Sequence, residues 1–145
     1  MMSEVQFDKD TIIAIIEKQF KHPEQQFVLS TMTADGFPDA RLMGNICQKS
    51  MQEVYFTCQT GSRKTEEILH NSKSSVYFTF DGTTVWLYGH ATVTRDESER
   101  SKIWNDRMLH IYKEGVDSPR LTVIKIVPTK IRFRAKTTNY IEIDL

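Results

Sequence analysis

Two adjacent cations open a predicted helix at the end of the segment Thr57-Cys58-Gln59-Thr60-Gly61-Ser62-Arg63-Lys64, and this arrangement suits the binding of an anion. The N-terminus of a helix already carries about half a positive charge, so cations in its first turn destabilise it. A phosphate group would remove this conflict, because backbone N–H groups, the Ser62 hydroxyl and the cations Arg63 and Lys64 can all bind it. The alternative interpretation is a solvated basic turn without a ligand.

A third cation, Arg41, interrupts the otherwise uncharged strand segment Ala40-Arg41-Leu42-Met43-Gly44. A charged side chain is rarely buried in a sheet without a partner. Arg41 can point into solvent and have no role, or it can reach the same anion as Arg63 and Lys64. In the second case three cations would grip a dianionic phosphate, and Gly44 would allow a flat ligand to approach the backbone closely.

Other kinds of catalytic site receive no support from the sequence. The motifs G-x-S-x-G, G-x-G-x-x-G and G-x-x-x-x-G-K-[ST] are absent, which argues against an esterase-type nucleophile and the common nucleotide-binding loops. We expect no metal site, because no metal-ligand spacing links the four histidines, His22, His70, His90 and His110, to one another or to a cysteine. Arg63 and Lys64 could lower the pKa of the nearby Cys58 thiol, but a buried strand cysteine is the simpler interpretation.

The length and charge of the chain are typical of one neutral domain spanning residues 1–145. The 145 residues carry 19 basic and 19 acidic side chains, so the formal net charge is zero. This balance argues against nucleic acid and anionic membranes as partners. Residues 1–8 lack the pattern of a secretory signal, no apolar run is as long as a membrane span, and Cys47 and Cys58 are predicted to be buried thiols. These features predict a cytoplasmic protein.

The hydrophobic pattern predicts about three helices and six to seven strands. The helices are expected at residues 8–21, 62–71 and 96–112, and the strands at residues 26–33, 39–48, 53–58, 75–80, 84–94, 121–127 and 130–136. Asp35-Gly36 and Asp81-Gly82 have the chemistry of hairpin turns. Because strands do not alternate one for one with helices, we predict a mainly β (α+β) fold with an antiparallel barrel or sheet, and not a doubly wound parallel fold.

The strand at residues 130–136 is the clearest by pattern, because apolar residues alternate with the cations Lys130, Arg132, Arg134 and Lys136. This alternation predicts that one face of the strand is in contact with water. Such a basic face would bind single-stranded nucleic acid only if exposed aromatic side chains accompanied it. We interpret it as a solvated face.

Several motifs, in order, resemble the pyridoxamine 5′-phosphate oxidase-like flavoproteins over residues 26–133. They are Leu29-Ser30-Thr31, Asp35-Gly36-Phe37-Pro38, Ala40-Arg41-Leu42-Met43, Tyr55-Phe56-Thr57, Gly61-Ser62-Arg63-Lys64 and Gly89-x-Ala91-x-Val93. Within that family the general stress protein branch is the most similar, through Asp96, Trp104, Tyr112, Gly115-Val116-Asp117-Ser118-Pro119 and Pro128. The resemblance implies an antiparallel split β-barrel that forms a homodimer and binds FMN between its subunits. FAD and a deazaflavin are the alternative cofactors.

The resemblance also implies which residues bind the flavin. Arg41, Leu42, Met43 and Gly44 would border it, with Arg41 near the ribityl phosphate. Phe56 and Thr57 would line the ring or the ribityl chain, and Ser62, Arg63 and Lys64 would hold the phosphate. Thr84 stands where the oxidase has a glutamine that touches the ring.

Two departures from the oxidase pattern argue against vitamin B6 oxidation. Ile46 stands where the oxidase has a lysine for the substrate phosphate, and the C-terminal residues 137–145 lack the tryptophan and the Arg-x-His-x-Arg segment of the pyridoxal site. We therefore predict an FMN-dependent oxidoreductase of unknown substrate and electron donor, for which no catalytic residue can be named. The alternatives are a flavin-binding or stress-sensing module without turnover and a structural dimer that has lost its flavin.

Overall fold

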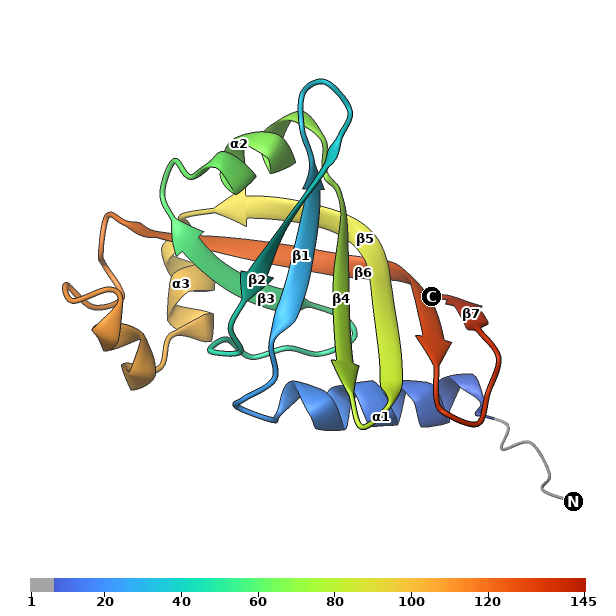
Figure 1. Ribbon diagram of the computed structural model, residues 1–145. Coiled ribbons are helices and arrows are strands. Elements are labelled where there is room, and N and C mark those ends of the chain that lie inside the picture. The colour runs from blue at the N-terminus through green and yellow to red at the C-terminus, as the bar shows by residue number, and fades with distance from the viewer. Residues whose placement is uncertain (1–6) are drawn as a thin grey trace, which may run out of the picture.

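The computed structural model describes residues 7–145, which form a curved seven-stranded antiparallel sheet with flanking helices (Figure 1). The helices are α1 (Lys9–Phe20), α2 (Arg63–His70), α3 (Glu97–Ile103) and the 3₁₀ helix η1 (Asp106–His110). The strands are β1 (Phe27–Met32), β2 (Pro38–Met43), β3 (Val54–Gln59), β4 (Lys73–Phe80), β5 (Thr83–Thr94), β6 (Leu121–Arg134) and β7 (Ile141–Asp144). The predicted mainly β (α+β) class is confirmed.

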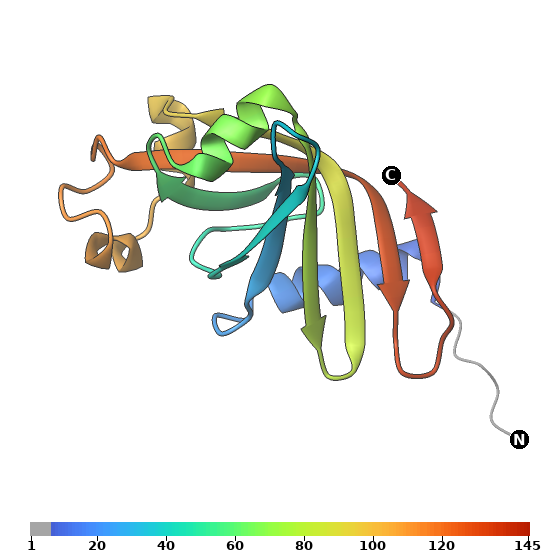
Figure 2. The same ribbon diagram turned by 45° about the horizontal axis from the view of Figure 1, so that its top comes forward.

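The sheet curls like a barrel but does not close. Its strand order is β2-β1-β4-β5-β6-β3, and β7 adds to β6 beside this path. Figure 2 shows the strands curving around a common interior, with the β6–β7 hairpin extending to one side. β2 and β3 stand at the two ends of the hydrogen-bonded order and do not pair with each other, as in a split β-barrel. The predicted turn at Asp81-Gly82 is confirmed, because both residues have the positive φ angles of a tight hairpin.

One long strand, β6, connects the two halves of the sheet, and here the predicted break between residues 127 and 130 was wrong. The chain continues as a single strand through Pro128. Pro128 lies opposite Gly89, where the pairing between β5 and β6 shifts register. A proline is tolerated at such an irregularity because it has no N–H group to donate. The strand β7, which pairs with β6, was not predicted. The predicted strand 39–48 was too long, because β2 ends at Met43.

Helix α1 covers the open lower end of the barrel, where it runs beneath β4 and β5 in Figure 1. It begins at the predicted place, because the Asp8 carboxylate caps it by accepting the Thr11 N–H at 2.8 Å. Ile12, Ile16 and Phe20 share one face and are buried in the main core between the helix and the sheet. None of the helices formed by residues 7–145 is both long and apolar enough to cross a bilayer.

The predicted helix at residues 96–112 is broken in two. α3 ends at Ile103, and Asn105 caps η1 by accepting the Arg107 N–H at 3.1 Å. The Asn105 amide also donates to the Ile46 carbonyl oxygen at 2.7 Å. Asparagine favours helix caps over helix interiors because its side chain competes for backbone groups. The two short helices place Ile103 and Met108 in a second apolar cluster on the outer face of β3.

Candidate functional site

A cavity of about 390 Å³ lies where the end of β2, the strand β3 and the first turn of α2 meet. Six residues predicted from the sequence line it together, although they come from three separate stretches of chain: Leu42, Met43, Gly44, Phe56, Thr57 and Lys64. The volume is in the range of small-molecule sites in proteins. The fold therefore places the apolar residues predicted to border a ligand next to one of the cations predicted to bind its charge.

The Ser62 hydroxyl is buried beside this cavity without a hydrogen-bond partner. Ser62 is the residue before α2, yet its side chain does not cap the helix. Among the side chains of residues 7–145, its Oγ is the buried polar atom left without a partner. Burial raises the pKa of the Cys58 thiol, and the neighbouring Ser62 hydroxyl and Lys64 charge offset part of that effect. Cys58 lines the cavity, and its sulfur, which is only a weak hydrogen-bond acceptor, is the group next to the hydroxyl.

The other two predicted cations, Arg41 and Arg63, form an ion-pair network with Asp39 and Glu67. Arg41 lies 3.2 Å from carboxylate oxygens of both Asp39 and Glu67, and Arg63 lies 3.2 Å from Asp39 and 3.4 Å from Glu67. Arg41 also donates to the Thr31 hydroxyl at 2.8 Å. Each guanidinium therefore already has carboxylate partners. Asp39 and Glu67 are two acids at this site that were not predicted from the sequence.

The charge balance of the network changes what each cation can contribute. Glu67 is only 7% exposed. Burial alone would raise its pKa, but the hydrogen bonds that Thr31 and Arg41 donate to it help to outweigh burial, and its pKa is lowered. Glu67 and Asp39 as carboxylates balance the charges of Arg41 and Arg63. Lys64, by contrast, has no carboxylate within 4.0 Å in the part of the chain that the structure describes.

Thr84, predicted to touch the flavin ring, does not line this cavity. It pairs with Arg134 near one end of β6, whereas Thr57 pairs with Val123 near the other end. Eleven residues of extended strand correspond to roughly 35 Å of path. Thr84 is therefore separate from the predicted residues that the fold brings together around this cavity.

Comparison with known proteins places the chain in a family. The family model for pyridoxamine 5′-phosphate oxidase-like proteins matches residues 16–142. The chain belongs to this family. No curated protein matches it. A solved structure from Listeria innocua, described as a candidate pyridoxamine 5′-phosphate oxidase, is 32% identical with a TM-score of 0.67, over 86% of this chain and 95% of the other.

Two further solved structures share the fold at lower identity. A Clostridium acetobutylicum protein related to general stress protein 26 of Bacillus subtilis has a TM-score of 0.80 and 18% identity, over 96% of this chain and 97% of the other. A Nostoc punctiforme protein, described as pyridoxamine 5′-phosphate oxidase-related and FMN binding, has a TM-score of 0.63 and 11% identity, over 94% and 95% of the two chains. The resemblance to the oxidase-like family is thus confirmed, and a protein related to general stress protein 26 shares its fold.

Several residues that line the cavity were not predicted from the sequence. Ile111 and Tyr112 line it from the segment after η1, whereas the sequence predicted one long helix over residues 96–112. Tyr112 is buried, which raises the pKa of its hydroxyl. Ile46, expected in place of a substrate-binding lysine, does line the cavity. Cys58 and Gln59 directly follow the predicted Phe56 and Thr57 in β3, so their place in the chain could have indicated them, but only the tertiary fold brings in the segment after η1.

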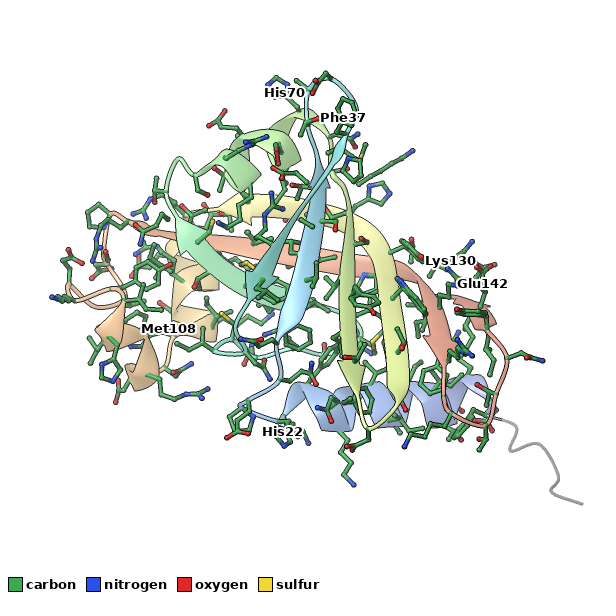
Figure 3. The ribbon with its side chains drawn as sticks, in the orientation of Figure 1. His22, Phe37, His70, Met108, Lys130 and Glu142 are labelled. Carbon is green, nitrogen blue, oxygen red and sulfur yellow. The ribbon has the colours of Figure 1, made fainter. Side chains whose placement is uncertain are left out.

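The basic face of β6 is occupied by aromatic side chains. The Arg132 guanidinium lies 4.6 Å from the Trp86 ring centroid and 4.2 Å from that of Tyr140, and Arg134 lies 5.0 Å from Tyr140. Figure 3 labels Lys130 and Glu142 on the neighbouring strands β6 and β7. Stacking of this kind stabilises the outer face of the sheet.

Within the described residues no three His, Cys, Asp or Glu side chains gather as metal ligands.

Proposed function

We propose that the protein binds FMN in the cavity formed by β2, β3 and α2. Support comes first from the buried, unpartnered Ser62 hydroxyl at the start of α2. Leaving a buried hydroxyl without a hydrogen bond costs about 1–3 kcal/mol, so native proteins rarely do it without a ligand or function. A phosphate oxygen would satisfy this hydroxyl and the Lys64 ammonium together, next to the first-turn N–H groups of the helix.

The remaining lining fits the apolar part of the same cofactor. Leu42, Met43 and Gly44 would border the flavin on one side, and Phe56 and Thr57 on the other. Arg41 and Arg63 would act mainly through Asp39 and Glu67, holding the strand β2 against α2 near the phosphate. FMN supplies the electron-transfer chemistry when bound, and the protein supplies orientation and electrostatics.

The cavity mouth supports a homodimer with the flavin at its interface. Leu42 lines the cavity and is 66% exposed, and Ile111 on its other side is 45% exposed. Exposed apolar side chains at the rim of a site mark a surface that another molecule covers. A second subunit would shield these residues and could bring its own Thr84 to the flavin.

We further propose that the bound flavin takes part in oxidation and reduction, with a substrate other than pyridoxamine phosphate. Ile46 lines the cavity where the oxidase pattern requires a cation, so the phosphate of a B6 vitamer would find no charge partner there. Anaerobic addition of NADH or NADPH to the FMN complex tests this activity. Loss of the yellow absorbance supports it, whereas a complex that neither donor reduces favours a flavin-binding module without turnover.

Titration with FMN, followed by quenching of flavin fluorescence, tests the binding site. Lys64→Ala is expected to weaken binding about tenfold or more, because it removes a charge-assisted contact of about 1.5–3 kcal/mol. Lys9→Ala is the matched control, since Lys9 is also a lysine in the first turn of a helix, at the start of α1. Equal FMN affinity in all three proteins would contradict the proposed phosphate site.

A further inference from the structure

A second, larger cavity of about 590 Å³ lies between the C-terminal end of α1, the segment 45–49 and the junction of α3 with η1. Its walls include Lys21, Lys49, Trp104 and Arg107. Figure 3 labels His22 and Met108, which follow Lys21 and Arg107 in the chain, on the α1 side and the α3 side of this region. Ile46 lines both this cavity and the flavin cavity, so the two are neighbours.

The charges around this second cavity are strongly unbalanced. Four cations line it, namely Lys21, Lys49, Lys102 and Arg107, and no aspartate or glutamate does. Lys102 has a carboxylate partner, Glu53, at 2.7 Å. The other three cations have no carboxylate within 4.0 Å among residues 7–145. Gathering cations without a counter-charge is unfavourable, and a bound anion would relieve that cost.

Lys49 is the most constrained of these cations. Its Nζ donates to the Asn45 Oδ1 at 2.8 Å and to the Cys47 carbonyl oxygen at 2.9 Å. It also lies 4.6 Å from the centroid of the Phe56 ring. Burial lowers the pKa of Lys49 to about 8, and the charge of Arg107 acts in the same direction. An ammonium group has three donors, so one remains for a ligand.

Arg107 and Trp104 complete the features of a ligand site. The Arg107 guanidinium makes one long contact of 3.5 Å to the Ile46 carbonyl oxygen, which leaves most of its donors free for a planar acid group. Trp104 is partly exposed and presents an apolar, planar surface to the same cavity. The Asn45 amide donates to the carbonyl oxygens of Phe20, the last residue of α1, and of His22, which partly offsets their negative charge near this cavity.

We propose that this cavity binds a small organic anion, with its carboxylate or phosphate group between Lys49 and Arg107 and its apolar body against Trp104. The proposal is independent of the flavin, because neither Ser62 nor Lys64 lines this cavity. This cavity would be a second ligand site next to the flavin cavity.

Trp104 itself provides the readout. The chain has two tryptophans, so a Trp86→Phe background makes Trp104 the sole tryptophan emitter. We would titrate this protein with benzoate, phenyl phosphate and inorganic phosphate at ionic strength held constant with chloride. The expected result is saturable quenching by benzoate or phenyl phosphate, tighter than any response to inorganic phosphate. Lys49→Met and Arg107→Gln should each weaken binding about tenfold or more, and Lys130→Gln, on the opposite side of the sheet, should leave it unchanged.

Three results would overturn the proposal. The first is a response that does not saturate for any of the three probes, or that chloride alone reproduces. The second is unchanged binding in both Lys49→Met and Arg107→Gln; Arg107 is exposed, so its substitution should leave the fold intact even if the buried Lys49 is needed for folding. The third is loss of the Trp104 response in Lys64→Ala, which would place the anion in the flavin cavity instead.

Discussion

The buried ammonium of Lys49 makes a quantitative prediction about stability at alkaline pH. Its pKa falls from an ordinary 10.5 to about 8 because burial disfavours the charged form. Between pH 8 and 10.5 the unfolded chain therefore binds more protons than the folded one, and stability rises with pH through this window. Integrated from pH 7 to pH 10, the shift contributes about 2.5 kcal/mol to the free energy of unfolding.

The substitution Lys49→Met keeps most of the aliphatic stem and removes the titrating group. The quantity to measure is the free energy of unfolding of the variant minus that of the parent, from urea titrations at pH 7 and pH 10. We expect this difference to fall by about 2.5 kcal/mol over that range, because only the parent gains stability. The hydrogen bonds that Lys49 gives to Asn45 and Cys47 add an offset at pH 7.

Cys47 titrates in the same window with the opposite sign, so it must be removed from both proteins. Burial raises its pKa from 9.0 to about 11, which lowers stability as pH rises from 9 to 11. Both proteins are therefore made in a Cys47→Ala background. A difference between variant and parent that stays constant from pH 7 to pH 10 would refute the argument, because it would mean that the Lys49 ammonium is not desolvated.

Three other substitutions test the fold around the two cavities by urea unfolding. Glu67→Gln should lower stability by about 2 kcal/mol at pH 7, and because the pKa of Glu67 is lowered in the fold, the deficit should shrink as pH falls below 4.5; a deficit independent of pH would speak against the ion-pair network. Gly89→Ala should cost about 3 kcal/mol, because a Cβ there would collide with the backbone of Val127 and Pro128, and a neutral effect would place the bulge elsewhere. Asn105→Ala should cost about 1–2 kcal/mol through the lost cap of η1, and no change would show that the break between α3 and η1 has another cause.

Local features of the fold could be predicted from the sequence. The spacing of Ile12, Ile16 and Phe20 fixes the buried face of α1, and Asp81-Gly82 gives the turn between β4 and β5. In each case the relevant neighbours are a few residues apart in the chain, so periodicity and turn chemistry suffice. The same holds for the positions of the strands β1 to β5 along the chain, apart from the end of β2.

Features that depend on distant contacts could not be predicted. Asn105 breaks the expected helix with the help of the Ile46 carbonyl, which is remote in the chain. The predicted break between residues 127 and 130 was wrong because β6 continues through Pro128 at an irregularity opposite Gly89, in another strand.

The candidate site was predictable in part of its residues but not in its charge balance. Leu42 to Gly44, Phe56, Thr57 and Lys64 do meet in one cavity. No sequence pattern indicated that Asp39 and Glu67 would partner Arg41 and Arg63, because that network joins a strand to a helix. Likewise, nothing in the sequence pattern indicated that Lys49 would be buried among aromatic rings instead of facing solvent.

A crystal structure of the protein grown with FMN tests the central claim most directly. The account predicts the flavin phosphate within hydrogen-bond distance, about 2.7–3.1 Å, of both the Ser62 Oγ and the Lys64 Nζ, with the ring system against Phe56. Density for FMN elsewhere on the protein, or a Ser62 hydroxyl still without a partner in crystals saturated with FMN, would contradict it.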